Sequence, residues 1–314
     1  MKNSLTKLLG IKYPILQGGM AWISDAVLVA AVSNAGGAGN IGTGGRSAEW
    51  TRDEIRKTKT LTNKPFGVNL LLQSSNVDEL LEVICAEKVS FVTLGAGNPV
   101  PYINRLKTAG IKVIPVVPNV RLAKRVAENG ADAFVMEGME AGGHIGTLTT
   151  MALLSNVPSS VKNVPIIAAG GIADGRALAA ALLMGASGAQ IGSLFLLTEE
   201  CSVHPSYKQR IIEASDTDSV VTGYSRGHGV RCLKNTFTQK YLQLETSGAP
   251  QEQLDKLASG TGRKSALDGD VENGSLEVSQ SLHLLNEVKS CRQVIDTLVA
   301  ETNTALNRAS ELVL

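Results

Sequence analysis

The chain lacks a net charge of either sign. Its 314 residues include 30 Lys and Arg against 29 Asp and Glu, which leaves a formal net charge of +1. Proteins that bind nucleic acids or acidic membranes usually present a strongly basic surface, so this balance argues against both partners. The sequence also lacks an apolar run of transmembrane length and an N-terminal segment with the apolar centre of a signal peptide. We therefore expect a cytoplasmic protein.

Paired cysteines and paired histidines are missing as well. The four cysteines are scattered without a CxxC pair, and the four histidines show no metal-ligand spacing. This argues against a disulfide framework and against a metal site. Aromatic residues are scarce at 4%, whereas there are 32 glycines. Abundant glycine is typical of a chain with many tight turns between regular elements.

What the chain does have is a regular alternation of short apolar runs and helical patterns. Apolar runs without a two-residue period suit parallel strands that are covered on both faces. We expect strands at 13–17, 39–42, 65–71, 90–94, 112–117, 133–137, 165–169 and 188–191. We expect helices at 26–34, 47–60, 77–88, 101–109, 121–129, 149–154 and 175–184. Eight such units predict an α/β fold, a closed TIM (β/α)8 barrel rather than an open sheet.

The alternation stops near residue 216. We expect the barrel to occupy residues 1–215, and the more polar, glycine-containing stretch 216–273 to form a cap or lid that binds substrate. A helical pattern returns at 274–314, which predicts terminal helices that pack back on the barrel. In the cap, Arg231 and Lys234 are candidates for contacts with phosphate groups, with solvated surface charge as the alternative.

Nearly every predicted strand ends in glycine or a polar residue. In a barrel of this type the active site lies at the carboxyl ends of the strands. The segments AAGGIADG (168–175) and GAQIGS (188–193) follow the seventh and eighth strands. Phosphate sites recur at these two loops, where backbone amides and a helix N-terminus hold the anion. A GxGxxG match at 37–42 follows a helix and enters a strand, so it lacks the context of a dinucleotide fingerprint.

These motifs resemble those of a known family. The segments are QGGMAW (17–22), GVN (67–69), GAGNP (95–99), EGMEAGGHIG (137–146), AAGGIADG and GAQIGS. Together they resemble the flavin-dependent enoyl-acyl-carrier-protein reductase II family, within the larger nitronate monooxygenase group of FMN barrels. The resemblance implies that NADH or NADPH reduces a bound FMN, which passes hydride to a trans-2-enoyl thioester carried by acyl carrier protein in fatty-acid elongation. It also implies a homodimer.

The resemblance places the cofactor on particular residues. The phosphate would lie on the amides of Gly170, Gly171, Gly192 and Ser193, after the strand that ends at Ala169. The remaining FMN contacts fall on Gly18, Gly19, Met20, Asn69, Glu137, Gly142, Gly143 and Gln190. His144 is the catalytic candidate, since it would project over the flavin after two glycines that let the chain pass close to the cofactor.

His144 suits two reactions. In a reductase it would bind the thioester carbonyl and stabilise the enolate, or help to deliver the proton to the α-carbon. In a nitronate monooxygenase it would be the base that removes the proton beside the nitro group. A third alternative is a flavin-binding barrel without turnover. The chain departs from the reductase pattern at Ser279, where a glycine is usual, and across 236–264, so substrate identity is less constrained than flavin binding.

Overall fold

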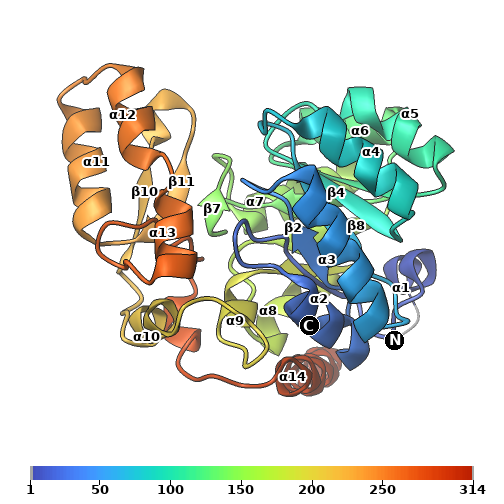
Figure 1. Ribbon diagram of the computed structural model, residues 1–314. Helices are drawn as coiled ribbons and strands as arrows, with labels where there is room; N and C mark the ends of the chain where they lie inside the picture. Colours follow the sequence, from blue (N-terminus) through green and yellow to red (C-terminus); the bar gives the residue numbers. More distant parts are fainter. Residues whose placement is uncertain (1–2, 313–314) are drawn as a thin grey trace.

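A computed structural model describes residues 3–312, and its centre is a parallel barrel (Figure 1). The strands are β1 (Ile15–Gln17), β2 (Asn40–Gly42), β3 (Gly67–Leu71), β4 (Phe91–Gly95), β5 (Lys112–Val117), β6 (Phe134–Glu137), β8 (Ile166–Ala169) and β9 (Gly188–Ile191). They are hydrogen-bonded in the order β1-β9-β8-β6-β5-β4-β3-β2. A parallel bridge between Leu16 and Ala38 joins β1 to the residues that precede β2. The predicted α/β TIM barrel is confirmed.

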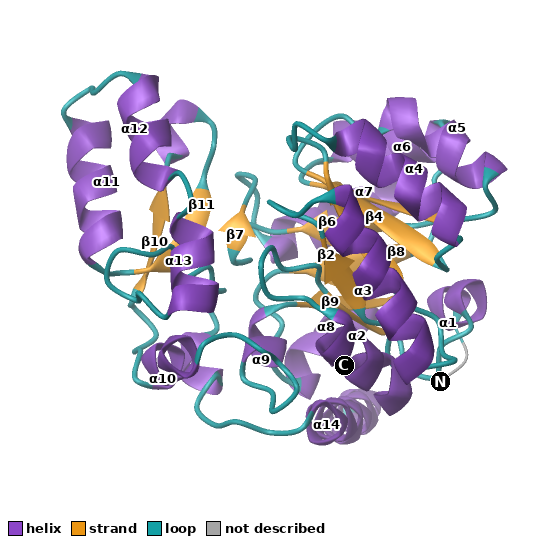
Figure 2. Ribbon diagram, viewed as in Figure 1, coloured by secondary structure: helices purple, strands orange, loops and turns teal. Residues whose placement is uncertain are grey.

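A helix precedes β1, and further helices then alternate with the strands (Figure 2). They are α1 (Ser4–Leu9), α2 (Ala26–Ala35), α3 (Ala48–Leu61), α4 (Val77–Glu87), α5 (Val100–Thr108), α6 (Val120–Glu128), α7 (Thr150–Ser160) and α8 (Gly175–Leu183). Side-chain caps begin several of them: Asp25 accepts hydrogen bonds from the Val27 and Leu28 amides, and Asp174 accepts one from Ala177. Such caps satisfy amides that have no partner inside the helix. The 37–42 glycine match joins α2 to β2, so it is not a nucleotide-binding turn.

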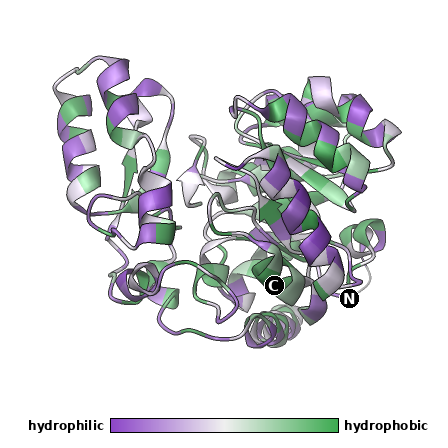
Figure 3. Ribbon diagram, in the orientation of Figure 1, coloured by the Kyte–Doolittle hydropathy of each residue, from purple (hydrophilic) through white to green (hydrophobic). Residues whose placement is uncertain are grey.

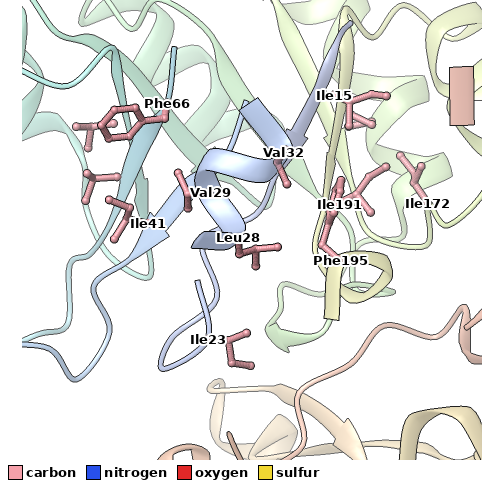
Figure 4. Close-up of a cluster of buried hydrophobic side chains, with 14 of the residues drawn as sticks. Ile15, Ile23, Leu28, Val29, Val32, Ile41, Phe66, Ile172, Ile191 and Phe195 are labelled. Carbon is pink, nitrogen blue, oxygen red and sulfur yellow. The ribbon is translucent and has the colours of Figure 1, made fainter. Parts of the chain in front are cut away.

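Two layers of apolar side chains hold the barrel together. Inside it, Leu16, Phe91, Ile114, Val135 and Ile167 form a buried cluster. Between the strands and the helices lies the larger cluster, in which Figure 4 shows α2 packing among side chains of β2 and β9. The helices turn hydrophilic faces outward (Figure 3). This placement follows from the cost of leaving apolar surface in water.

A second group of strands and helices covers the carboxyl ends of the barrel strands. Its sheet pairs β10 (Ser219–Thr222) with β11 (Val230–Leu233), and β11 with β7 (Gly143–His144), all antiparallel. Its helices are α10 (Pro205–Ile212), η1 (Tyr224–Arg226), α11 (Thr236–Thr246), α12 (Gln251–Ala258) and α13 (Thr261–Asp268), and α9 (Ser193–Leu196) leads into it. We call residues 216–273 the cap. Because β7 comes from a barrel loop, the cap sheet is anchored directly to the barrel.

The C-terminal prediction needs a correction. Residues 274–281 are not helical, and only a 3₁₀ turn, η2 (Leu282–Leu284), precedes the long helix α14 (Cys291–Glu311). The helical pattern expected from residue 274 was wrong because this segment bonds to the cap and the barrel loop instead: the Leu233 amide donates to Leu276 O, and the Gln280 amide donates to Glu140 O. α14 packs against α2 and α8. Within residues 3–312, no helix has the length and apolar character needed to cross a membrane.

Candidate functional site

One cavity of about 740 Å³ lies between the barrel rim and the cap. The structure brings every residue of the predicted site into its lining, namely Gly18, Gly19, Met20, Asn69, Glu137, Gly142, Gly143, His144, Ala169, Gly170, Gly171, Gln190, Gly192 and Ser193. These residues come from five strands and the loops that follow them. Their proximity is therefore a property of the barrel, whereas their individual roles stay predictions.

Asn69 is held in a chain of buried hydrogen bonds. Its Oδ1 accepts from Thr93 Oγ1 at 2.8 Å, and Thr93 Oγ1 accepts from Asn40 Nδ2 at 2.8 Å. Gly19 packs directly on the Asn69 side chain, where a Cβ would have no room. Since Oδ1 is used by Thr93, a ligand in the cavity would meet the amide nitrogen of Asn69, which is a donor.

Two half-buried polar side chains of the lining, Glu137 and Gln190, lie in surroundings that are unusual for polar groups. Burial raises the pKa of Glu137 to about 8, because desolvation disfavours the charged carboxylate. Gln190 Oε1 is buried and has no hydrogen-bond partner among residues 3–312. Buried polar atoms are usually paired, so Gln190 indicates a ligand that brings a donor into the cavity.

The loop after β6 is organised by Glu140. Its carboxylate accepts from the Thr150 amide at 2.9 Å and from Thr150 Oγ1 at 3.1 Å. Thr150 Oγ1 also lies 2.9 Å from Gly170 O. Glu140 therefore ties this loop to the first turn of α7 and to the loop after β8, a supporting role that the sequence pattern did not reveal.

The two glycines before His144 permit a close approach that the sequence alone did not predict. A Cβ on Gly142 would stand 2.7 Å from the backbone of Val278, and one on Gly143 would stand 2.7 Å from Glu277 Oε2. Gly143 also has a φ of +77°, which favours glycine. His144 follows in β7, with an exposed side chain that lines the cavity.

The loops after β8 and β9 also line the cavity, and the loop after β8 lies directly beside the loop after β6. Gly170 and Gly171 have φ values of +97° and +72°, so both adopt the left-handed conformation. Ser193, at the start of α9, accepts a hydrogen bond from the Ser279 amide at 2.8 Å. The segment 275–280 is thus fixed to the rim at Ser193, at the position where the chain departs from the reductase pattern.

Sequence reasoning missed the lining residues that come from outside the rim motifs. They include Phe237, Tyr241 and Glu277. Phe237 and Tyr241 lie on helix α11, which the sequence pattern of the cap did not reveal. Arg231 was expected at phosphates or at the surface. It is instead 3% exposed, and its guanidinium donates to Met139 O and Ser219 Oγ, each at 3.0 Å. Arg231 therefore supports the loop after β6 through its hydrogen bond to the backbone of Met139.

Comparison with known proteins gives a consistent class. The family model "Nitronate monooxygenase" matches residues 2–81 and 74–301. A relative from Mycobacterium tuberculosis, named a 5-hydroxy-7a-methyl-1-oxo-octahydro-1H-indene-4-carboxyl-CoA dehydrogenase, is 33% identical over 100% of this chain and 99% of its own length. A probable nitronate monooxygenase from Staphylococcus aureus is 33% identical over 90% of this chain and 92% of its own. The solved structure of FabK from Thermotoga maritima is 44% identical, covers all of both chains, and superposes with a TM-score of 0.97.

Proposed function

The chain belongs to the nitronate monooxygenase family of oxidoreductases, and within it we propose that the protein is an FMN-dependent enoyl thioester reductase. The proposed reaction saturates the double bond of a trans-2-enoyl group on acyl carrier protein, with NADH or NADPH as electron donor, in fatty-acid elongation. One observation carries the proposal: the glycine-rich strand ends and His144 line one cavity. The chain is also 44% identical to FabK along its full length.

The residues of the cavity fit FMN. Its volume of about 740 Å³ lies within the range of about 300–1,000 Å³ that is usual for small-molecule sites. Gln190 Oε1 has no hydrogen-bond partner among residues 3–312 and could accept a hydrogen bond from the cofactor. Gly170 and Gly171 have positive φ values and line the cavity with backbone that no side chain covers. When bound, FMN supplies the hydride chemistry between a nicotinamide and the β-carbon of the enoyl group.

The protein's own residues would hold and orient the reactants. The amides of Gly170, Gly171, Gly192 and Ser193 would bind the FMN phosphate, since backbone N–H groups are suited to anions. Asn69 would donate to the ring from its amide nitrogen. Glu137, with its raised pKa, would present a largely neutral carboxylic acid near neutral pH. His144 would donate a hydrogen bond to the thioester carbonyl, where negative charge develops.

An anaerobic experiment tests this proposal. The purified protein is mixed with NADH or NADPH while the flavin absorbance is followed, and an enoyl thioester is then added. We expect rapid bleaching by the nicotinamide and recovery on addition of the thioester. Bleaching without recovery would contradict the enoyl substrate, and absence of a flavin spectrum would contradict the cofactor.

The second candidate is nitronate oxidation. It is favoured by the Staphylococcus relatives named probable nitronate monooxygenases and by the free cavity position of His144, which suits a base. In the same anaerobic experiment, bleaching by an alkyl nitronate but not by NADH or NADPH would select this candidate. Absence of bleaching with any donor would instead favour a flavin-binding barrel without turnover.

The proposal also includes the oligomeric state of the protein and the molecule that carries the enoyl group. We propose a homodimer, which light scattering of the purified protein would measure. Acyl carrier protein as the carrier is tested by comparing the same enoyl group on acyl carrier protein and on coenzyme A. A kcat/KM at least 10-fold higher for the protein-bound substrate is expected.

A further inference from the structure

Glu277 lines the cavity but is not among the residues of the predicted site. It lies on the non-helical segment 274–281, opposite Cys232 of β11 in an antiparallel bridge. Its backbone is fixed from two sides: the Leu233 amide donates to the neighbouring Leu276 O at 2.9 Å, and Tyr207 Oη donates to Glu277 O at 3.0 Å. The position of Glu277 is therefore set by the cap sheet and α10 together.

The side chain of Glu277 is turned toward the His144 loop. Its Oε2 lies where a Cβ on Gly143 would approach to 2.7 Å, so it is directly beside the residue that precedes His144. Both Glu277 and His144 line the same cavity. Across residues 3–312, no hydrogen bond or ion pair reaches the Glu277 carboxylate. A secluded carboxyl without a structural partner, next to a histidine in a cavity, is a candidate for proton transfer.

The groups that face Glu277 favour its protonated form. Burial raises the pKa of the Glu277 carboxyl, and the nearby His144 opposes this shift in part. The other titratable groups around it are Tyr207 from α10 and Cys232 from β11. Burial raises the pKa values of both, so both favour their neutral forms and neither offsets the effect of burial on Glu277. Glu277 thus keeps its proton at a higher pH than an exposed glutamate.

We propose that Glu277 is the acid that protonates the α-carbon of the enoyl thioester, while His144 holds the thioester carbonyl. The inference rests on the proposed function. Hydride adds to the β-carbon, and the electron pair of the double bond moves into the thioester as an enolate. The O–H bond of Glu277 then breaks as a C–H bond forms at the α-carbon, leaving Glu277 ionised. Solvent returns the proton to Glu277, and NAD(P)H supplies the two electrons for the next cycle.

The division of labour follows from the two side chains. His144 would donate a hydrogen bond to the carbonyl, and Glu277 would protonate the α-carbon. Because they act on different atoms, removing each side chain should change a different step of the reaction. Loss of His144 should slow enolate formation without changing the face that receives the proton. Loss of Glu277 should leave the enolate to be protonated by water, slowly and from either face.

The test uses the flavin-loaded full chain and the variants Glu277→Gln, Glu277→Asp and His144→Gln. The control is Glu272→Gln, which changes an exposed carboxylate shortly before Glu277 in the chain. With crotonyl-coenzyme A as probe in D2O, wild type and Glu272→Gln should place deuterium on one face of the α-carbon. We expect Glu277→Gln to be reduced by NADH within about 2-fold of wild type, but to be reoxidised by the probe about 100-fold or more slowly, with deuterium on both faces. Glu277→Asp should recover part of the rate, and His144→Gln should be slow but retain one face.

A second readout does not depend on turnover. Infrared difference spectra of wild type minus Glu277→Gln at neutral pH should contain the carbonyl band of a protonated carboxylic acid. Reoxidation of Glu277→Gln at the wild-type rate with deuterium on one face would overturn the assignment of Glu277 and leave the proposed function intact. Failure of wild type itself to transfer hydride to any enoyl thioester would overturn both.

Discussion

The Cα of Gly142 lies against the backbone of Val278, at a point where a Cβ would stand 2.7 Å from the Val278 nitrogen. Two chain segments more than a hundred residues apart therefore meet backbone to backbone beside the cavity. The contact continues at Gln280, whose amide donates to Glu140 O at 2.9 Å. The glycine pair before His144 thus serves the docking of residues 275–280, which carry Glu277, as well as the shape of the cavity.

Replacing Gly142 with alanine tests this contact. The added methyl group meets backbone atoms that cannot move without displacing the segment, so Gly142→Ala should lower the free energy of unfolding by about 1–3 kcal/mol. Urea denaturation measures the change. Gly95→Ala is the matched control, because its Cβ would meet only Val116 Cγ2 at 3.8 Å. Equal stability of the two variants would contradict the contact.

The barrel was predictable because its signals are local. Strand β5 (Lys112–Val117) and strand β9 (Gly188–Ile191) have the predicted bounds, and Gly36 and Gly185 turn left-handed at the ends of α2 and α8. The segment 274–281 was misread as the start of the C-terminal helices, although its apolar residues, Leu276 and Val278, are two positions apart, a spacing typical of an extended strand. Its conformation is decided by partners far away in the chain, Leu233 and Glu140, which no local pattern records.

His144 is expected to act on the substrate and not on the reduction of the cofactor. His144→Gln should lower kcat for the enoyl thioester by about 10²–10³-fold, as losses of hydrogen-bond donors to a developing oxyanion do. Reduction by NADH should change less than about 3-fold. His228→Gln is the control, since His228 is exposed on the cap and does not line the cavity. A parallel loss in both half-reactions would assign His144 to the cofactor instead.

Gln190 is expected to bind the cofactor through its unpartnered oxygen. Gln190→Met keeps a side chain of similar length but removes the acceptor, and a hydrogen bond of this kind contributes about 0.5–1.5 kcal/mol. The Kd for FMN should therefore rise by about 2–10-fold, as measured by fluorescence titration of flavin-free protein. Gln239→Met, at an exposed position of α11, should leave the Kd unchanged. An unchanged Kd in Gln190→Met would remove Gln190 from the cofactor contacts.

The site was predictable where its residues share a motif and not where they come from the cap. All fourteen predicted residues line one cavity because strand ends in a parallel barrel meet on one rim. Trp22 was within a recognised motif, yet its φ of +67° and its stacking with Arg46, 4.5 Å from the ring centroid, depend on tertiary packing. Glu277 carries no sequence signal beyond its place in a segment that departs from the family pattern.

Glu137 should make the stability of the flavin-free protein depend on pH. The pKa of its carboxyl is raised from 4.5 to about 8 by burial. The unfolded chain therefore loses this proton at lower pH than the folded chain, and stability falls as pH rises from about 4.5 to 8. Gln cannot ionise, so Glu137→Gln should match wild type near pH 4.5 and exceed it by a few kcal/mol at pH 8, given about 1.4 kcal/mol per pKa unit.

Urea unfolding of both proteins at pH 5, 6.5 and 8 measures this difference. Glu128→Gln is the comparison, because Glu128 is exposed at the end of α6 and exposed substitutions usually change stability by less than about 0.5 kcal/mol. A widening gap between Glu137→Gln and wild type on going from pH 5 to pH 8 would identify a carboxylic acid that the folded cavity keeps neutral. A gap that stays constant with pH would mean that Glu137 is already ionised in the folded protein, and FMN would then meet a negative charge at this wall.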